Sequence, residues 1–416
     1  MKLHTIGSTL LGCVVFGATV MSVAAASPTD APAAGQVVDV RTLGAQGDGI
    51  ADDTDAFERA ITQAQQTLAG AAVHVPPGRY RISRTLTLKS VRLQGATGGA
   101  WNSDSMAVPV LTLTNRDEPG LRLDAGGAVH GLMLDTDWGG QPIGPRPPAI
   151  ELAGVGCRVT ETKIWNAWDA ILADGKNNVG RALIEKCFIV NVHNTGVRMT
   201  GTLDSSWISK VEVWSPGSET FLKQGVGFLL GQNDVLLMSD CFVFKAWRGY
   251  RFMDKIPGCA IKGGTWGSMS NCSADYSDKA ISVEGTHTVS ITGGTYWTHF
   301  GALRIEGAGA QVRVSGAELG ANGLPAVEIL SARAVTLSGC QIRRIMRQFN
   351  GPALRITGGH VAVTGNVIEC SSRALDISRK ASVTLIGNLV KHNLPDDAGV
   401  PKPADDDAAA TPGEAS

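Results

Sequence analysis

The chain has no excess of charge of either sign. Among its 416 residues, 37 Lys and Arg stand against 38 Asp and Glu, which gives a formal net charge of -1. A chain with this balance has no global positive field that would attract nucleic acid, so no nucleic-acid partner is expected. Beyond the N-terminal segment, the chain also lacks an apolar run long enough to cross a bilayer.

Cysteine patterns typical of metal or disulfide frameworks are missing as well. The cysteines after residue 26 are Cys157, Cys187, Cys241, Cys259, Cys272, Cys340 and Cys370, and no two of them form a CxxC pair. Their spacing fits neither a zinc site nor a dense disulfide framework. We expect most of them to be buried small hydrophobic residues, and the sequence indicates no metal and no cofactor.

The two ends of the chain differ from the rest in composition. Lys2 precedes a mostly apolar segment from Ile6 to Ala25, and the small residues at 24–26 fit a cleavage site. We expect residues 1–26 to be a signal peptide, residues 27–36 a linker, and the mature protein to be secreted or periplasmic without membrane attachment. A retained membrane anchor is the alternative. Residues 394–416 are rich in Pro, Ala and Asp, which predicts a disordered tail.

A repeat organises the residues in between. An aliphatic residue, small polar residues and then another apolar residue recur as "ITGGTYW", "VSGAELG", "LSGCQIR", "VTGNVIE" and "LIGNLVK". The leading aliphatic residues, with looser copies included, are Val159, Leu183, Ile208, Leu237, Ile261, Ile291, Val314, Leu337, Val363 and Leu385. Their mean spacing is about 25 residues, which is typical of a solenoid.

A second short strand precedes most copies of this repeat. Examples are "AIELAG", "GVGFLLG", "KAISVEG", "GALRIEG" and "PALRITG". No coil contains a segment of helical length with a 3.6-residue period, so residues 37–393 are expected to form one all-β domain, a parallel β-helix. Propeller blades are the alternative, but their repeats are longer and antiparallel. Asn366 and Asn388 share one turn position, where their amides can bond along the stack.

The stretch "LGAQGDGIADDTDAFERAI" concentrates acidic residues beside two glycines. It could form a metal site or a catalytic carboxylate pair. However, Asp53 and Thr54 are suitable N-caps for a following helix whose apolar residues share one face. A solenoid needs its open end covered, so we interpret this stretch as a short capping helix that holds the fold together.

This stretch, followed by "VHVPPGRYRIS", resembles the N-terminal signature of the pectate lyase superfamily, in its rhamnogalacturonase-, epimerase- and polygalacturonase-like branch. The close resemblance covers residues 38–83. It implies a right-handed, single-stranded parallel β-helix and activity on acidic or complex polysaccharides. The catalytic motifs of polygalacturonase-type hydrolases and the arginine motif of pectate lyases do not occur in the coils.

Tryptophans gather in the loops that follow the repeated strand. They are Trp165, Trp168, Trp214, Trp247, Trp266 and Trp297. Because their coils are successive or nearly so, we expect the rings to line one edge of the solenoid and to stack on sugar rings. Packing of loops against the solenoid wall is the alternative. Arg248 lies at the same edge, and Arg343 in a later coil could hold the carboxylate of an acidic sugar.

Two acids are the expected catalytic residues. Glu212 stands two residues before Trp214, so both side chains should point outward from one strand, and Asp169 follows Trp165 and Trp168. Hydrolysis of a glycosidic bond needs two carboxylates, which makes a glycoside hydrolase the first hypothesis. A lyase acting on a uronate and a non-catalytic glycan-binding or structural protein are the alternatives. The expected partner is a polysaccharide or oligosaccharide, and homo-oligomer formation is left open.

Overall fold

The computed structural model describes residues 37–66, 72–95, 108–323, 325–344, 351–370 and 373–392. The predicted signal peptide, the predicted linker and the predicted tail lie outside the described residues. No helix of the described part is long and apolar enough to cross a membrane.

Sheet A is formed by the first strand of each coil. Its fourteen strands are, in order, β1 (Val37–Asp39), β3 (Ala72–Val75), β6 (Arg92–Gly95), β9 (Ala128–His130), β12 (Arg158–Thr160), β15 (Leu183–Glu185), β18 (Ser206–Ser209), β21 (Asn233–Ser239), β24 (Thr265–Ser270), β27 (Thr288–Thr292), β30 (Gln311–Ser315), β33 (Ala334–Ser338), β36 (His360–Thr364) and β39 (Ser382–Ile386).

Sheet B is formed by the second strand of each coil. Its fourteen strands are β2 (Asp48–Asp52), β4 (Gly78–Ile82), β7 (Pro109–Leu113), β10 (Met133–Thr136), β13 (Lys163–Trp165), β16 (Phe188–Val190), β19 (Glu212–Trp214), β22 (Phe242–Phe244), β25 (Ser273–Ser277), β28 (Thr295–Thr298), β31 (Glu318–Ala321), β34 (Gln341–Arg344), β37 (Val367–Cys370) and β40 (Leu389–His392).

Sheet C contains the strand that closes each coil. Its twelve strands are β5 (Leu86–Leu88), β8 (Leu121–Leu123), β11 (Ile150–Leu152), β14 (Asp169–Ala173), β17 (Thr195–Met199), β20 (Val226–Leu230), β23 (Arg248–Met253), β26 (Lys279–Glu284), β29 (Leu303–Ile305), β32 (Val327–Ile329), β35 (Pro352–Ile356) and β38 (Arg373–Ile377).

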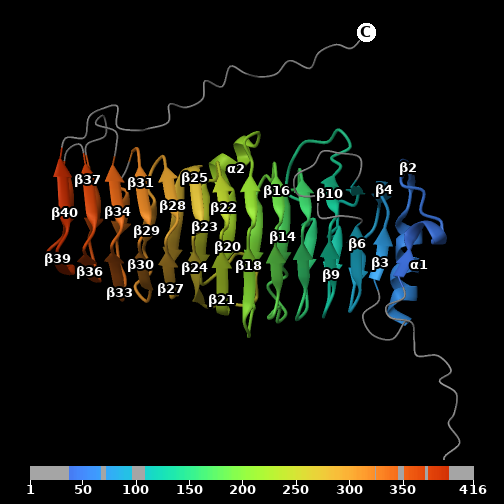
Figure 1. The fold of residues 1–416 in the computed structure, drawn as a ribbon, viewed down its shortest axis with the longest axis horizontal. Helices are drawn as coiled ribbons and strands as arrows, with labels where there is room; N and C mark the ends of the chain where they lie inside the picture. Colours follow the sequence, from blue (N-terminus) through green and yellow to red (C-terminus); the bar gives the residue numbers. More distant parts are fainter. Residues whose placement is uncertain are drawn as a thin grey trace, which may run out of the picture. The chain divides into compact units, whose positions relative to one another are not determined.

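The chain therefore winds as a parallel solenoid, as the repeat predicts. Strands of successive coils pair in parallel within each sheet, and the coils follow one another from α1 (Thr54–Gln66) to β40 (Figure 1). In most coils a turn of two residues joins sheet A to sheet B, while the connections from sheet B to sheet C vary in length. All the second strands quoted from the sequence belong to sheet C, which confirms that part of the prediction.

The predicted repeat positions are right in some coils and shifted in others. Val159, Ile208 and Ile291 are buried at equivalent inward positions of sheet A. In two coils the inward residue is Ile184 or Met238 rather than Leu183 or Leu237. A shift of one residue turns a strand side chain to the opposite face, so these two assignments were wrong.

The predicted repeat position Ile261 was also wrong, for a different reason. Ile261 lies in the connection between β23 and β24, and the sheet A strand of this coil begins later, at Thr265. The inward residue of that strand is Met269.

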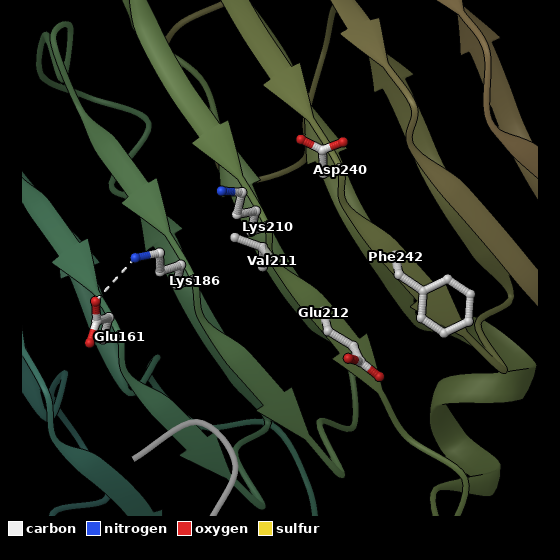
Figure 2. Close-up of a pocket in the computed structure, with 7 residues that line it drawn as sticks. All are labelled: Glu161, Lys186, Lys210, Val211, Glu212, Asp240 and Phe242. Carbon is white, nitrogen blue, oxygen red and sulfur yellow. Dashed lines mark hydrogen bonds and ion pairs between the residues drawn. The ribbon is translucent and has the colours of Figure 1, made fainter. Parts of the chain in front are cut away.

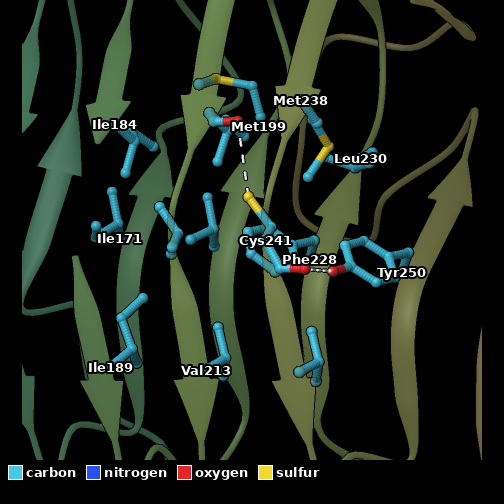
Figure 3. Close-up of a cluster of buried hydrophobic side chains, with 14 of the residues drawn as sticks. Ile171, Ile184, Ile189, Met199, Val213, Phe228, Leu230, Met238, Cys241 and Tyr250 are labelled. Atoms are coloured by element: carbon cyan, nitrogen blue, oxygen red, sulfur yellow. Dashed lines mark hydrogen bonds between the residues drawn. The ribbon is translucent and has the colours of Figure 1, made fainter. Parts of the chain in front are cut away.

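The core is a column of stacked apolar side chains between the three sheets. Ile189 and Val213 occupy paired positions of successive sheet B strands, and Phe228 lies parallel to Tyr250 with ring centroids 5.1 Å apart (Figure 3). The seven cysteines of the described residues are free and buried, as expected. Four of them, Cys187, Cys241, Cys272 and Cys340, occupy the second position of the turn between sheets A and B.

The N-terminal end of the solenoid is covered by α1, which begins at Thr54 as predicted. Phe57, Ala60 and Ile61 are buried on its inner face. The capping assignment of Asp53 was wrong in detail, because its carboxylate accepts the backbone N–H groups of Gln46 (2.6 Å) and Gly47 (3.3 Å), while Asp52 accepts the Thr54 N–H (3.0 Å). The acidic stretch thus ties the preceding loop to the helix start.

Two short helices were not expected from the sequence. The 3-10 helix η1 (Val40–Leu43) lies between β1 and β2. Helix α2 (Glu219–Gln224) fills the connection from β19 to β20, where the Ser218 side chain accepts the Phe221 N–H and Phe221 is buried. Its six residues are too few for the periodicity to stand out.

The asparagine stack is confirmed. Asn366 is buried, its Oδ1 accepts the Cys340 N–H at 2.8 Å, and its Nδ2 donates to the Leu337 carbonyl at 2.9 Å and to Asn388 Oδ1 at 3.0 Å. These bonds satisfy backbone groups of the neighbouring coil that no strand partner reaches.

We expect Asn366→Ala to lower the free energy of unfolding by about 2 kcal/mol, because it leaves buried backbone groups without partners. Asn388→Ala, in the last coil and half-buried, should cost clearly less. Urea unfolding of the two variants measures the difference, and equal losses would show that the stack adds no stability of its own.

Candidate functional site

The outer face of sheet B carries a row of side chains at one equivalent position of successive strands. In coil order these residues are Asp135, Trp165, Val190, Trp214, Phe244, Asp275, Trp297, Gly320, Arg343, Glu369 and Lys391. Three of the predicted tryptophans, Trp165, Trp214 and Trp297, therefore share one row, as expected. Neighbouring members of the row are separated by one strand spacing, about 4.8 Å.

The rings in the middle of this face form a continuous chain of contacts. Ring centroids are 6.2 Å apart for Phe188 and Trp214, 6.5 Å for Trp214 and Phe244, and 5.7 Å for Phe244 and Tyr276. Tyr276 in turn meets His299 at 5.2 Å. Trp214 is 38% exposed, so its ring offers an open apolar surface. We call this surface the aromatic face of sheet B.

Two acids lie among these rings. Glu212 points outward two residues before Trp214, and Asp275 stands between Phe244 and Trp297 in the row. Partial burial raises the pKa of Glu212 above its ordinary value. Burial also raises the pKa of Asp275, opposed by a hydrogen bond from the Tyr276 N–H and by the charge of His299. Burial therefore favours the protonated form of both acids, and the opposing contacts are found only at Asp275.

The geometry of the two acids follows from the strand register. They lie on the same outward face, two coils apart and two residues apart along the strand direction. Strand spacing and rise place their Cα atoms about 12 Å apart. Extended side chains can narrow this distance to the separation, roughly 6.5–9.5 Å, at which two carboxyl groups leave room for a water beside a glycosidic bond.

Glu212 also borders a hollow of about 530 Å³. The hollow is lined by Glu161, Lys186, Lys210, Val211, Glu212, Asp240 and Phe242 (Figure 2). Five of these residues belong to the turns that lead from sheet A into sheet B, while Glu212 and Phe242 begin strands of sheet B. The hollow is thus continuous with the aromatic face at Glu212.

Asp169, the second predicted catalytic acid, is not brought next to Glu212. It begins β14 in sheet C, two coils before β19, and Asn194 donates a hydrogen bond to it at 2.8 Å. Burial raises the pKa of Asp169. A catalytic role of this residue stays a prediction, but it does not form a pair with Glu212.

The two predicted substrate-binding arginines already have partners. Arg248 lies 2.6 Å from Asp278 and stacks on the Trp247 ring at 3.8 Å. Arg343 pairs with Glu318 (3.2 Å) and Glu369 (2.9 Å), and its guanidinium lies 5.5 Å from the centre of the Trp297 ring. Both arginines hold neighbouring coils together, and an anionic ligand would have to compete with these carboxylates.

The remaining tryptophans divide between two places. Trp168 and Trp247 lie in the connections from sheet B to sheet C, beside the aromatic face. Trp266 was wrongly assigned to this edge, because it belongs to β24 of sheet A and is 62% exposed there. The loop inserted before β24 moves the start of that strand, which the repeat alignment did not detect.

Two rings of the aromatic face were not identified from the sequence. Phe188 and Phe242 each follow a buried cysteine of the turn and are the first outward residues of their strands. The alternation of outward and inward side chains after Cys187 and Cys241 is the signal that could have located them. Among the described residues, no cluster of His, Cys, Asp and Glu could hold a metal ion.

Comparison with known proteins identifies relatives of the N-terminal segment and of the fold. Residues 37–109 match the family model described as rhamnogalacturonase A/epimerase, pectate lyase-like. No curated protein matches the chain in sequence.

Solved structures of similar fold come from several proteins. The mannuronan C-5 epimerase AlgE6 A-module of Azotobacter vinelandii has a TM-score of 0.54 and 16% identity, over 86% of this chain and 96% of that one. The GH87 alpha-1,3-glucanase catalytic unit of Streptomyces thermodiastaticus has a TM-score of 0.53 and 16% identity, over 87% and 70%. A tailspike protein of E. coli bacteriophage HK620, in complex with a hexasaccharide, has a TM-score of 0.51 and 12% identity, over 85% and 66%.

These likenesses agree with the architecture described above. Parallel strands joined by crossover connections in one sheet are almost always right-handed. The N-terminal segment is thus similar to the pectate lyase-like family, and the stack of three parallel sheets gives the chain the fold of a right-handed parallel β-helix.

Proposed function

We propose that this protein is an exported glycoside hydrolase that binds an extended acidic or complex glycan along the aromatic face of sheet B. One observation carries the proposal: two acids whose pKa values are raised by burial, Glu212 and Asp275, lie among aromatic rings on one outward face. Sugar rings present apolar C–H faces to such rings, and one sugar unit is about as long as one strand spacing, roughly 4.8 Å.

The environments of the two acids suggest their roles. Burial alone acts on Glu212, so it is the better general acid, donating a proton to the oxygen of the departing sugar. The Tyr276 N–H and the charge of His299 stabilise the carboxylate of Asp275, which acts as the base that activates a water. The proton leaves Glu212 as the glycosidic bond breaks, and Asp275 takes a proton from the attacking water.

The activities of the structural neighbours support this substrate class. They include an epimerase of a polysaccharide, a glucanase and a tailspike protein bound to a hexasaccharide. Lyase chemistry on a uronate needs an available cation to stabilise the carbanion that forms. Arg248, Lys279 and Arg343 are all engaged with carboxylates, so none of these three is available for that role.

A screen of the purified protein on a panel of neutral and acidic polysaccharides tests the proposal. Reducing ends without new ultraviolet absorbance are the expected products. Absorbance from an unsaturated uronate would show that the protein is a lyase and not a hydrolase. Binding without any product would favour the non-catalytic alternative.

The aromatic face is tested by Trp214→Ala. We expect this change to weaken glycan binding on the order of tenfold, because an exposed stacking surface is lost. Trp266→Ala is the matched control, since it removes a more exposed ring from sheet A. Affinity electrophoresis of both variants measures the change. Equal binding by Trp214→Ala and the parent would show that the glycan does not lie on this face.

A further inference from the structure

The first residue of the turn between sheets A and B has a positive φ in coil after coil. These residues are Gly131, Glu161, Lys186, Lys210, Asp240, Asn271, Gly293, Gly316, Gly339, Gly365 and Gly387. In the coils after Asn271 the position is always glycine, which adopts this conformation without strain. In the central coils it carries Glu, Lys, Lys, Asp and Asn instead.

The fold does not require these side chains. A Cβ placed on Gly316, Gly339 or Gly365 would meet no atom within 4 Å, so the turn offers a side chain nothing to pack against. A left-handed conformation is costly for residues such as Lys and Glu. Strained residues of this kind are retained where their side chains serve a function, and here they occur in the same coils as the aromatic face.

These turn residues line the hollow beside Glu212. Figure 2 shows Glu161, Lys186, Lys210 and Asp240 following one another across neighbouring strands, with Glu212 and Phe242 on the far side of the hollow. Successive turns are joined by backbone bonds such as Lys186 N–H to the Ser209 carbonyl, at 3.0 Å. The Lys186 and Lys210 turns are therefore about one strand spacing, ~4.8 Å, apart.

The two lysines differ in their partners. Lys186 pairs with Glu161 at 3.3 Å, whereas Lys210 forms no ion pair with any carboxylate of the described residues. Two ammonium groups on adjacent turns repel each other, and a bound anion would remove that repulsion. Asp240 stands in the next turn, and because Lys186, Lys210 and Asp240 are all exposed, water screens the charges of all three.

We propose that the hollow beside Glu212 binds a carboxylate of an acidic sugar, with Lys210 as its main cation and Lys186 as the second. This inference rests on the proposed function and assigns the hollow as the place where the acidic group of the glycan is held. The hollow opens next to Glu212, so a carboxylate held there places a neighbouring sugar over the aromatic face. Phe242 supplies an apolar surface for the ring that carries the carboxylate.

The experiment compares Lys210→Gly with Asn271→Gly, a change at the same turn position without loss of charge. Lys210→Gly should melt about 1–3 °C higher than the parent, because glycine relieves the strained φ of the lysine, whereas Asn271→Gly should melt close to the parent, because asparagine adopts this conformation with little strain. Only Lys210→Gly should bind polygalacturonate and alginate more weakly, by about five- to tenfold in affinity electrophoresis. Binding of the carboxyl-reduced, neutral forms of the same polymers should be equal for all three proteins.

Two further variants separate charge from backbone conformation. Lys210→Gln keeps the strain and loses the charge, so it should bind acidic polymers as weakly as Lys210→Gly without melting higher. Lys210→Arg should bind like the parent.

Three results would overturn the inference. They are unchanged binding of acidic polymers by Lys210→Gly, equal weakening for acidic and neutral polymers, and stronger parental binding to dextran sulfate than to either uronate polymer. A failure of the proposed function is distinguishable, because Trp214→Ala would then bind acidic and neutral polymers as well as the parent does.

Discussion

Replacing Glu212 with Gln should reduce turnover of the glycan by about 10²–10⁴-fold while leaving binding nearly unchanged. Glutamine has the size of glutamate, but it has no acidic proton to give to the departing sugar. The measurement is the rate of reducing-end release at saturating glycan, together with the dissociation constant of the same polymer. Full turnover by Glu212→Gln would remove this residue from the mechanism.

The pH profile gives an independent test of the same role. Burial raises the pKa of Glu212, so the acid form needed for catalysis persists to higher pH than for an ordinary glutamate. Turnover should therefore fall as the pH rises through this raised pKa. It should also fall at low pH, where protonation of Asp275 removes the base. In Asp275→Asn the acidic limb of the profile should disappear along with most of the activity.

Glu219→Gln is a suitable control for these variants. Glu219 is exposed on α2 in the same coil and pairs with Lys223 on the helix surface. Its substitution should leave both turnover and the pH profile unchanged. An equal loss in Glu219→Gln would show that the losses reflect disturbed folding of this coil.

Asp53→Ala should lower the free energy of unfolding by about 2–4 kcal/mol, because two backbone N–H groups near the solenoid end lose their acceptor. Asp53 is 1% exposed, and its carboxylate holds the loop at Gln46 and Gly47 against the start of α1. The open end of the first coils would then be less well covered. Urea unfolding measures this loss.

The matched control is Asp55→Ala in the first turn of the same helix. Asp55 pairs only with Arg84 at the surface, and such pairs contribute about 0–1 kcal/mol. Folded Asp53→Ala should retain the parental turnover rate. Normal stability with lost turnover would instead make the acidic stretch part of a catalytic site.

Much of the fold is predictable from the sequence because a solenoid repeats its local interactions. The aliphatic alternation located the strands of sheet C, and the shared position of Asn366 and Asn388 predicted their hydrogen bond. The errors arose where the alternation is ambiguous. Leu183 precedes another aliphatic residue, and Leu237 lies within a run of apolar residues, so two registers fit equally well.

The candidate site was harder to predict from the sequence than the fold. Glu212 and Trp214 were placed correctly because they alternate within one strand. Asp275 could not be singled out, because its position between Phe244 and Trp297 depends on pairing across coils of unequal length. The unequal coil lengths also explain why Trp266 lies in sheet A and not at its predicted edge. The alternation within a strand can be read from a few neighbouring residues. Which residues of successive coils share a row depends on the length of every loop between those coils.

The central claim is that a glycan lies along the aromatic face of sheet B with its scissile bond beside Glu212. A crystal structure of Glu212→Gln with an oligosaccharide of the polymer that the parent binds tests it most directly. We predict sugar rings on Trp214 and Phe244 and a glycosidic oxygen within hydrogen-bonding distance of residue 212. An oligosaccharide bound instead over sheet C, beside Asp169 and Arg248, would contradict the account.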